Sequence, residues 1–373
     1  MRHVHLIGIG GTGLSAIAQV LLEKGYRVSG SDRSLSPLAA GVQAKGAQVA
    51  LGHRAENVKG ADLVIRSSAV SDDNPEVQAA RAAGIPVLKR AQFLAELIGE
   101  KSCIAIAGTH GKTTTTAMIA WLLAAAGRDP SYIIGGTLRQ LGGNAHAGAG
   151  PEFVIEADEY DYMFLGLHPQ VAVVTNVEHD HPDCFPTPED FFAAFHTFAG
   201  QVTAGGTLIA CGDDAGVQRL LGELAQQDME IRTYGLNTGD RFRAVSVEMT
   251  DDGRTCFRMA GGPEVRLQTP GLHNVRNALA ALCVADWLGL PLEPAAQALG
   301  EFSGVGRRFE IRGEVGGIIV IDDYAHHPTE IRATLQAARQ RFPQRELWVV
   351  WQPHTYSRLS LFWDEFLAAF AQA

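Results

Sequence analysis

Short apolar strands alternate with helix-like stretches along this chain, and the alternation starts afresh three times. The first run covers residues 2–98, and the second opens with the apolar strand SCIAIAG at residues 102–108. The third follows Arg308 and contains GIIVIDDYA at residues 317–325. Strands separated by helices are typical of parallel sheets, because a parallel neighbour can be reached only through a long crossover. The sequence therefore predicts an α/β fold.

The three runs predict three domains, which we place at residues 1–98, 99–307 and 308–373. A chain of 373 residues is long enough for them, since a typical domain has roughly 100 to 200 residues. The third run holds only two predicted strands and two predicted helices, which cannot cover both faces of a doubly wound sheet. We therefore expect the third domain to be incomplete.

Periodicity and flanking residues locate the elements of each run. In the first run we predict strands at residues 3–8, 26–32, 61–70 and 85–88, and helices at residues 14–24 and 75–83. In the second run we predict strands at residues 102–108, 152–158, 170–176 and 206–211, a strand-rich polar section at 241–267, and helices at 274–288 and 292–301. In the third run we predict strands at residues 317–325 and 346–351, and helices at residues 328–340 and 361–370.

Composition argues against several classes of protein. The formal net charge is -10 and acidic residues are spread along the chain, so no basic face is available for nucleic acid. The five cysteines lack CxxC spacing, which favours reduced core thiols. The apolar stretch Val4–Leu22 is interrupted by four glycines, so it predicts a strand, a turn and a helix. No other run approaches the roughly 20 apolar residues of a membrane helix, and we expect a soluble, cytoplasmic protein without a membrane partner.

The strongest local motif is AGTHGKTTT at residues 107–115, between an apolar strand and a helix. Glycines let the backbone approach phosphates, helix N–H groups point at them, a lysine neutralises their charge, and a hydroxyl can bind magnesium. The motif departs from GxxxxGK[ST] in spacing, and an ordinary glycine turn is the alternative. We predict that these loop residues contact nucleotide phosphates: Gly108, Thr109, His110, Gly111, Lys112, Thr113 and Thr114.

A second glycine motif, IGIGGTGLS at residues 7–15, follows the first predicted strand. Its glycines satisfy GxGxxG, and Asp32 ends the next strand about 20 residues later. This pattern suits a helix N-terminus that accepts a pyrophosphate, with an acid able to reach a sugar or base. It fits NAD or a UDP-sugar, and purely structural glycines are the remaining alternative. A separate phosphate loop in the same chain favours the UDP-sugar, because a dehydrogenase has no use for one.

Carboxylates and histidines follow two predicted strands of the second domain, in EADEYD at residues 156–161 and TNVEHDHPD at residues 175–183. The carboxyl ends of parallel strands are where α/β folds bind ligands. Magnesium prefers oxygen ligands, so Thr113 and Glu156 are candidates, and His181 could serve a second ion. Zinc is a competing possibility, although no cysteine lies at ligand spacing. Other carboxylates could be solvated loop acids: Asp158, Asp161 and Asp183.

Four further polar motifs complete the pattern: LHNVRNALAA at residues 272–281, GVGRRFE at 304–310, DDYAHHPTE at 322–330 and QPHTYSR at 352–358. Asn274 could simply cap a helix, or contact a ligand together with Asn277. Arg307 and Arg308 lie near the predicted domain junction, where an arginine could deliver positive charge to a transferring phosphoryl group. Paired histidines before a proline, at the end of a buried strand, favour a functional role.

In this order the motifs resemble the Mur ligase family over essentially the whole chain, although no single motif would be specific. The resemblance implies a Rossmann-like UDP-binding N-terminal domain, a central P-loop ATPase domain, and a Rossmann-like C-terminal domain that is partial here. The motifs are most similar to those of members that join L-alanine to UDP-N-acetylmuramate with ATP and Mg²⁺. That reaction belongs to peptidoglycan synthesis and serves cell-wall biogenesis, cell shape and cell division.

The resemblance also implies a mechanism in which the muramate lactyl carboxylate attacks the γ-phosphate of ATP. The amine of L-alanine then attacks the acyl phosphate. The catalytic residues implied are Lys112 on the β- and γ-phosphates, Arg308 on γ-phosphate charge, His181 on a second magnesium, and His327. The resemblance further implies that Thr113 and Glu156 bind magnesium, that Asn274 and Asn277 contact adenine, and that Asp323 contacts the ATP ribose. It implies that His327 and Arg358 contact the muramate and alanine carboxylates. The residues implied to bind the UDP-substrate are Gly10, Gly11, Thr12, Gly13, Asp32, Ser67 and Ser68.

Several alternatives stay open at this point. A sister ligase that attaches a preformed peptide to UDP-N-acetylmuramate in wall recycling shares most of the motifs. A nicotinamide-dependent oxidoreductase and a fragment that only binds the UDP-substrate represent other classes. Within the family, the chain has no lysine after Lys112, which excludes the carbamylated lysine that some Mur ligases use for a second metal. Thr355 stands where some relatives carry another arginine. The oligomeric state and the order of binding stay open.

Overall fold

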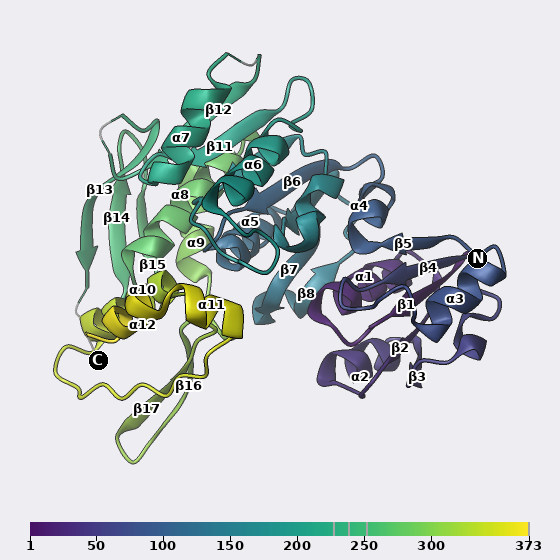
Figure 1. The fold of residues 1–373 in the computed structure, drawn as a ribbon. Helices are drawn as coiled ribbons and strands as arrows, with labels where there is room; N and C mark the ends of the chain where they lie inside the picture. Colours follow the sequence, from purple (N-terminus) through teal and green to yellow (C-terminus); the bar gives the residue numbers. More distant parts are fainter. Residues whose placement is uncertain (227, 238, 251–252, 372–373) are drawn as a thin grey trace.

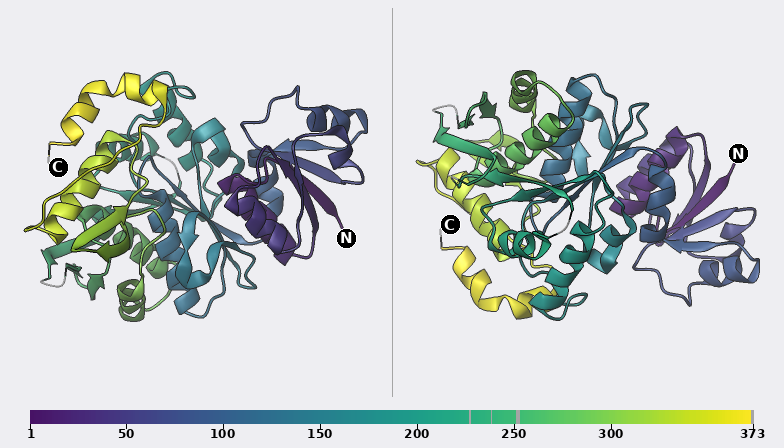
Figure 2. Two further views of the ribbon diagram at one scale, coloured as in Figure 1. Left: turned by 90° about the horizontal axis from the view of Figure 1, so that it is seen from below. Right: turned by 90° about the horizontal axis from the view of Figure 1, so that it is seen from above.

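The computed structural model describes residues 1–226, 228–237, 239–250 and 253–371. The chain forms two large sheets and a separate two-stranded sheet. The N-terminal domain and the C-terminal segment lie on opposite sides of the middle domain (Figures 1 and 2). In the described part of the chain, every helix is too short or too polar to span a membrane.

Five parallel strands form the N-terminal sheet, in the order β3-β2-β1-β4-β5. The strands are β1 (His3–Ile7), β2 (Arg27–Asp32), β3 (Gln48–Leu51), β4 (Leu63–Arg66) and β5 (Val87–Lys89). The helices are α1 (Thr12–Glu23), α2 (Pro37–Ala44), α3 (Pro75–Ala82), α4 (Arg90–Ile98) and the 3-10 turn η1 (Ala55–Val58). Every residue of β1 is buried, as expected for a central parallel strand. The predicted elements are confirmed, whereas α2, β3 and α4 are not predicted. Few residues of α2 and none of β3 are fully buried, so these two elements show little apolar periodicity, but α4 buries apolar residues at helical spacing, a signal that the prediction misses.

Ten strands form the sheet of the middle domain, in the order β15-β14-β13-β12-β11-β10-β6-β9-β7-β8. The strands are β6 (Ser102–Ala107), β7 (Ser131–Leu138), β8 (Gly143–His146), β9 (Glu152–Glu156), β10 (Val171–Val174), β11 (Thr207–Cys211), β12 (Glu230–Gly235), β13 (Phe242–Met249), β14 (Thr255–Met259) and β15 (Glu264–Leu267). The helices are α5 (Lys112–Ala125), α6 (Pro188–Ala199), α7 (Ala215–Leu224), α8 (Leu272–Trp287) and α9 (Leu292–Glu301), with 3-10 turns η2 (Arg139–Leu141) and η3 (Tyr160–Gly166).

The order of these strands positions the site. Strand β6 pairs in parallel with β9 on one side and β10 on the other. Alternate residues of β6 enter two cores: Cys103 and Ala105 pack in one, and Ile104 and Ile106 pack in the other. Because the strands are parallel, the loop after β6 lies between the two acidic motifs that follow β9 and β10. The strands and helices predicted for this domain are confirmed, although residues 251 and 252 of the predicted strand-rich section lie outside the described residues.

The C-terminal segment consists of an antiparallel pair, β16 (Glu310–Val315) and β17 (Ile318–Asp322), and the helices α10 (Pro328–Arg341), α11 (Tyr356–Leu361) and α12 (Trp363–Ala369). The predicted strand at residues 346–351 is wrong, because this stretch forms no strand and Trp348 is 84% exposed. In the described structure β17 pairs only with β16, and residues 346–351 do not pair with its second edge. An extended segment without a partner cannot satisfy its backbone groups in a sheet.

Candidate active site

The loop between β6 and α5 has the geometry of a phosphate-binding loop. Gly108 and Gly111 both have positive φ angles, +140° and +80°, which favour glycine. A Cβ at Gly111 would lie 2.8 Å from Asn277 Oδ1, so the loop backbone also packs tightly. Helix α5 begins at Lys112, and Thr113 and Thr114 lie in its first turn. The strand, loop and helix predicted from AGTHGKTTT are therefore confirmed.

The end of β10 holds this loop in place, through contacts that the motif alone does not reveal. The backbone N–H of His110 donates to Asn176 Oδ1 at 2.8 Å. The hydroxyl of Thr175 donates to His110 O at 2.6 Å, and that of Thr109 donates to Glu178 O at 2.7 Å. Asn176 and Thr175 belong to the TN pair that opens TNVEHDHPD, and the predicted pairing of β6 with its neighbour could have identified them.

Lys112 is anchored by a glutamate that is absent from the predicted site. Its Nζ lies 2.9 Å from Glu159 Oε2 and also donates to Gly108 O and Thr109 O. Glu159 is fully buried. Burial alone would lower the pKa of Lys112, but Glu159 and neighbouring carboxylates raise it above its ordinary value. The ammonium group is therefore charged at neutral pH.

Two of the three predicted metal ligands lie together. The hydroxyl of Thr113 donates to Glu156 Oε1 at 3.0 Å, and Glu156 Oε2 accepts from the backbone N–H of Gly135 at 2.7 Å. Burial raises the pKa of Glu156. A hydroxyl and a carboxylate at this separation are hard oxygen donors, which fit Mg²⁺. The third predicted ligand, His181, pairs with a different carboxylate: its Nε2 lies 3.3 Å from Glu159 Oε1. Glu159 in turn pairs with Lys112, the residue that precedes Thr113.

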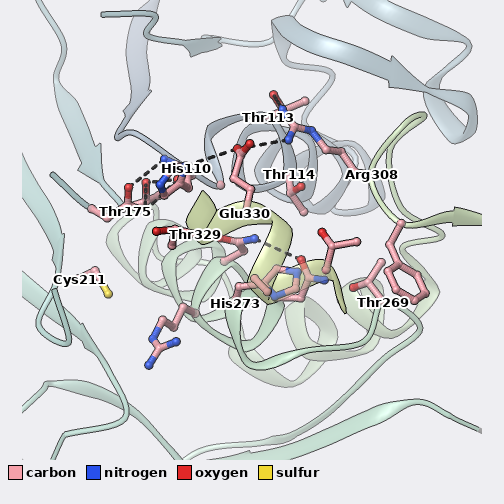
Figure 3. A pocket seen from close by; sticks show the side chains of 18 of the residues that line it. His110, Thr113, Thr114, Thr175, Cys211, Thr269, His273, Arg308, Thr329 and Glu330 are labelled. Atoms are coloured by element: carbon pink, nitrogen blue, oxygen red, sulfur yellow. Dashed lines mark hydrogen bonds and ion pairs between the residues drawn. The ribbon is translucent and has the colours of Figure 1, made fainter. Parts of the chain in front are cut away.

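Arg308 reaches the phosphate loop from the start of the C-terminal segment. Its Nη2 lies 3.5 Å from Thr113 Oγ1, and its Nη1 lies 3.7 Å from Glu330 Oε1. In Figure 3 the Arg308 side chain points toward Thr113, and Glu330 lies between Arg308 and His110. The predicted delivery of positive charge from the domain junction is therefore possible in this arrangement.

A cavity of about 390 Å³ extends from the phosphate loop toward α8. Its lining contains these predicted ATP-binding residues: His110, Gly111, Thr113, Thr114, Asn274, Asn277, Arg308 and Asp323. The alternative in which Asn274 only caps a helix is wrong, since Gly271 is the N-cap of α8 and Asn274 bonds instead to Pro270 O and Asn277. Asp323 accepts the backbone N–H of Phe309 at 2.7 Å and of Ala325 at 2.8 Å, so it also holds the junction.

His110 lies between two glutamates that come from different domains. Its Nε2 is 2.9 Å from Glu178 Oε2, and its Nδ1 is 3.4 Å from Glu330 Oε1. Burial alone would lower the pKa of His110, but these carboxylates raise it to about 9. The imidazolium therefore joins the middle domain to helix α10 at neutral pH.

His327 packs against this imidazolium with its ring 4.7 Å from that of His110. Among the described residues, His110, Glu178 and His327 form a group whose ligand atoms lie within 4.8 Å of one another. However, the backbone N–H of Thr329 donates to His327 Nδ1 at 3.3 Å. Burial lowers the pKa of His327 to about 4, so the neutral ring carries its proton on Nε2. That buried Nε2 has no protein partner and is an available hydrogen-bond donor.

Arg358 is already paired in this structure. Its Nε and Nη2 donate to the two carboxylate oxygens of Asp180 at 2.7 and 3.0 Å, and both side chains are buried. Burial alone would raise the pKa of Asp180, but Arg358 and His181 hold it well below its ordinary value. The predicted contact between Arg358 and a substrate carboxylate stays a prediction, and it requires a change in this pair.

The acids named as possible loop residues have protein partners. Asp158 accepts from Arg90 at 3.0 Å, and Asp161 pairs with Lys89 at 3.0 Å. Asp183 accepts from Tyr160 Oη at 3.0 Å. The first two pairs join the middle domain to the start of α4, so these two acids are partly exposed loop residues with a basic partner.

In the N-terminal glycine motif, Gly8 has a positive φ of +89°, and α1 begins at Thr12. Asp32 Oδ2 accepts the backbone N–H of Gly10 at 2.8 Å, so this acid supports the loop itself. Ser67 and Ser68 follow β4, and Ser67 lies next to the loop, since a Cβ at Gly8 would lie 3.1 Å from Ser67 Cβ. The predicted UDP-substrate residues therefore gather at one edge of the N-terminal sheet: Gly10, Gly11, Thr12, Gly13, Asp32, Ser67 and Ser68.

A second cavity, of about 590 Å³, connects the two glycine-rich loops. Thr12, Gly13 and Arg90 line it from the N-terminal domain. Thr113, Glu156 and Arg308 are among the residues that line it from the other side. A molecule bound at the N-terminal loop can therefore extend to the threonine and the glutamate that are proposed to hold a metal.

Comparison with known proteins gives matches along the whole chain. Residues 3–102 match the model for the Mur ligase family catalytic domain, residues 106–285 the Mur ligase middle domain, and residues 307–373 the Mur ligase glutamate ligase domain. The chain is 46% identical to a UDP-N-acetylmuramate–L-alanine ligase of Nitratidesulfovibrio vulgaris, over 99% of this chain and 81% of the relative. It is 48% identical to the ligase of that name from Renibacterium salmoninarum, over 100% of this chain and 80% of the relative.

Solved structures give the same result. The crystal structure of the UDP-N-acetylmuramate–alanine ligase from Thermotoga maritima superposes with a TM-score of 0.86 at 32% identity, covering 100% of this chain and 84% of that one. A murein peptide ligase from Psychrobacter arcticus superposes with a TM-score of 0.80 at 29% identity, covering 95% of this chain and 79% of that one.

Proposed function

The chain belongs to the Mur ligase family, and on this basis we propose that it joins L-alanine to UDP-N-acetylmuramate in an ATP-dependent reaction of peptidoglycan synthesis. Relatives named for this activity are 46% and 48% identical over nearly the whole chain. Since ATP and UDP-sugars are nucleotides of the cytoplasm, we place the reaction there.

The observation that carries this proposal is the cavity that joins the two loops. A ligase must bring the carboxylate of its UDP-substrate to the γ-phosphate of ATP, and these ligands bind at separate glycine-rich loops. The cavity begins at Thr12 and Gly13 and reaches Thr113, Glu156 and Arg308. An oxidoreductase has no need of such a passage between two phosphate sites.

The residues of the middle domain can stabilise phosphoryl transfer. Lys112 and the N–H groups at the start of α5 would bind the β- and γ-phosphates, and Lys112 would leave Glu159 to do so. Arg308 would offset charge on the γ-phosphate from the opposite side of the cavity. Thr113 and Glu156 would hold Mg²⁺, which supplies Lewis-acid stabilisation of the phosphate oxygens when it is bound. His181 would contribute to a second ion after leaving Glu159.

The C-terminal segment would complete the site for the acceptor. His327 carries a buried Nε2–H without a partner, which suits a carboxylate or phosphate oxygen. Arg358 would contribute a second contact once it exchanges Asp180 for a substrate carboxylate. The substrate carboxylate attacks the γ-phosphorus and ADP leaves. The amine of L-alanine then attacks the acyl carbon, and inorganic phosphate leaves as the amide forms.

The direct test is phosphate release from ATP and Mg²⁺ with UDP-N-acetylmuramate, with and without L-alanine. We expect release that needs both substrates and equals the amide formed. A parallel reaction with a tripeptide in place of L-alanine separates this activity from that of the peptide ligases. Phosphate release with the tripeptide but not with L-alanine would contradict the proposal. Binding of UDP-N-acetylmuramate without any phosphate release would contradict it as well.

A further inference from the structure

Arg90, the first residue of α4, lies where the N-terminal and middle domains meet. Its Nη2 donates to Asp158 Oδ2 at 3.0 Å. The same guanidinium covers the first turn of α1, because a Cβ on Gly13 would overlap Arg90 Nη1. Arg90 therefore contacts both the N-terminal glycine motif and the acidic motif that follows β9.

Arg90 lines the second cavity from the side of the N-terminal domain. Among the described residues, it is the one charged side chain that the N-terminal domain contributes to the lining. The glycine motif at residues 7–15 contains no lysine, arginine or histidine. Within this motif only backbone N–H groups can therefore offset the charge of a bound pyrophosphate. A positively charged side chain would have to come from another element.

The ion pair that now holds Arg90 is weak enough to exchange. The side chains of Arg90 and Asp158 are 21% and 35% exposed, so water screens their attraction. A pyrophosphate carries more charge than one carboxylate and can likewise bind an arginine through two oxygens.

We propose that Arg90 binds a phosphate oxygen of the pyrophosphate of the UDP-substrate, and that it leaves Asp158 when this substrate enters. The inference extends the proposed function and depends on it. Asp158 then acts as a competitor for Arg90, so loss of its charge strengthens substrate binding. Arg90 is a substrate-binding residue and takes no part in bond formation, because the pyrophosphate stays intact in the reaction.

The adjacent residue provides a matched control. Lys89 Nζ pairs with Asp161 Oδ1 at 3.0 Å and joins the same two domains. Neither Lys89 nor Asp161 belongs to the lining of the second cavity. A residue that only clamps the domains together and a residue that binds the pyrophosphate can therefore be distinguished.

The test is calorimetric binding of UDP-N-acetylmuramate to the full chain without ATP. We expect Arg90→Met to weaken binding about tenfold or more, as for loss of a charge-assisted hydrogen bond. Asp158→Asn should tighten binding about two- to fivefold, and Lys89→Met should change it less than about twofold. Equal weakening by all three variants, or no change in Arg90→Met, would overturn the inference.

A second comparison separates a pyrophosphate contact from a general loss of structure. We expect Arg90→Met to lose affinity for UDP and to bind uridine like the wild type, whereas an equal loss for both ligands would contradict a phosphate contact. The wild type controls for the proposed function. If the wild type fails to bind UDP-N-acetylmuramate, the proposed function fails; if it binds and Arg90→Met binds equally well, only the role of Arg90 fails.

Discussion

The two glycine-rich loops look alike in sequence, but they obtain positive charge in different ways. The middle-domain loop carries its own cation, because Lys112 ends it and begins α5. The N-terminal loop has none, and Arg90 covers it from α4. A cation built into a loop lies beside every phosphate that the loop binds. A cation from another element depends on how the domains pack, so it suits a pyrophosphate that is held and released intact.

The loops also differ in the contacts that fix their backbones. In the N-terminal loop the carboxylate of Asp32 accepts the N–H of Gly10, the hydroxyl of Ser36 donates to Gly10 O, and the N–H groups of Gly8 and Ile9 donate to Ser31 O. In the middle-domain loop the neutral amide of Asn176 accepts the N–H of His110, and Thr175 and Thr109 add hydroxyl contacts. At the loop where chemistry is proposed, side chains after the neighbouring strand β10 hold both the N–H and the C=O of His110, which agrees with the positional accuracy that phosphoryl transfer demands.

The largest expected effect comes from removing the built-in cation. Lys112→Ala should lower ATP-dependent phosphate release by roughly 100- to 1,000-fold, as for loss of an electrostatic contact to a transition state. UDP-N-acetylmuramate should bind as to the wild type, because its loop lies in the other domain. Phosphate release and calorimetry on the same preparation check both statements. Unchanged turnover would refute the assignment of the phosphate loop.

The next effect tests whether the middle-domain loop also needs a cation from outside. Arg308 Nη2 lies 3.5 Å from Thr113 Oγ1, and Arg308→Met should lower the rate of phosphate release roughly 10- to 100-fold. Arg307→Met is the matched control, because both guanidinium groups lie over Tyr324 but, of these two arginines, only Arg308 contacts Thr113 in the described structure. We expect a much smaller loss for this variant. Equal losses would mean that the junction needs both arginines for its structure.

A third prediction concerns the ion pair that only the middle-domain loop possesses. Glu178 and Glu330 raise the pKa of His110 to about 9 from 6.5, against the effect of burial. Stabilisation from this raised pKa is fully present below pH 6.5 and is lost as the pH rises through about 9. Burial alone would raise the pKa of Glu178, but His110 lowers it to about 2 from 4.5. The stabilisation of the fold by this lowered pKa is present above pH 4.5 and is lost as the pH falls toward about 2.

The variant Glu178→Gln should therefore be less stable than the wild type, and by most between pH 4.5 and 6.5. The difference in free energy of unfolding, measured by urea denaturation, should shrink as the pH rises toward 9. In a His110→Gln background the same substitution should show no such pH dependence. A difference that stays constant from pH 6 to 9 would argue against the ion pair.

The sequence predicts the parts of this molecule in which one strand, one loop and one helix are consecutive. The strand, loop and helix around residues 107–115 and those around residues 7–15 follow this rule and are confirmed. Partners that come from distant segments escape prediction, because only folding brings them together. Glu159 beside Lys112, Asp180 beside Arg358 and Arg90 over Gly13 are of this kind.

The failed strand at residues 346–351 shows a related limit. Its apolar and β-branched residues fit a buried strand, but a strand forms only where a neighbouring edge accepts its backbone hydrogen bonds. Val350 and Trp348 are exposed instead. Local composition therefore predicts the tendency of a segment, and the availability of a partner decides the outcome.

The smallest expected effect concerns Asp32, for which sequence and structure indicate different roles. The GxGxxG pattern predicts a contact with the sugar or base, whereas the structure shows Asp32 accepting from Gly10 and Arg33 backbone N–H groups. If loop support is its main role, Asp32→Asn should weaken UDP binding by only about two- to fivefold, since an amide oxygen keeps one of these bonds. Binding of 2′-deoxy-UDP decides between the roles. If the substitution and the loss of the 2′-hydroxyl weaken binding by independent, additive amounts, Asp32 only supports the loop. If loss of the 2′-hydroxyl weakens binding to the wild type but not to Asp32→Asn, Asp32 contacts the ribose directly.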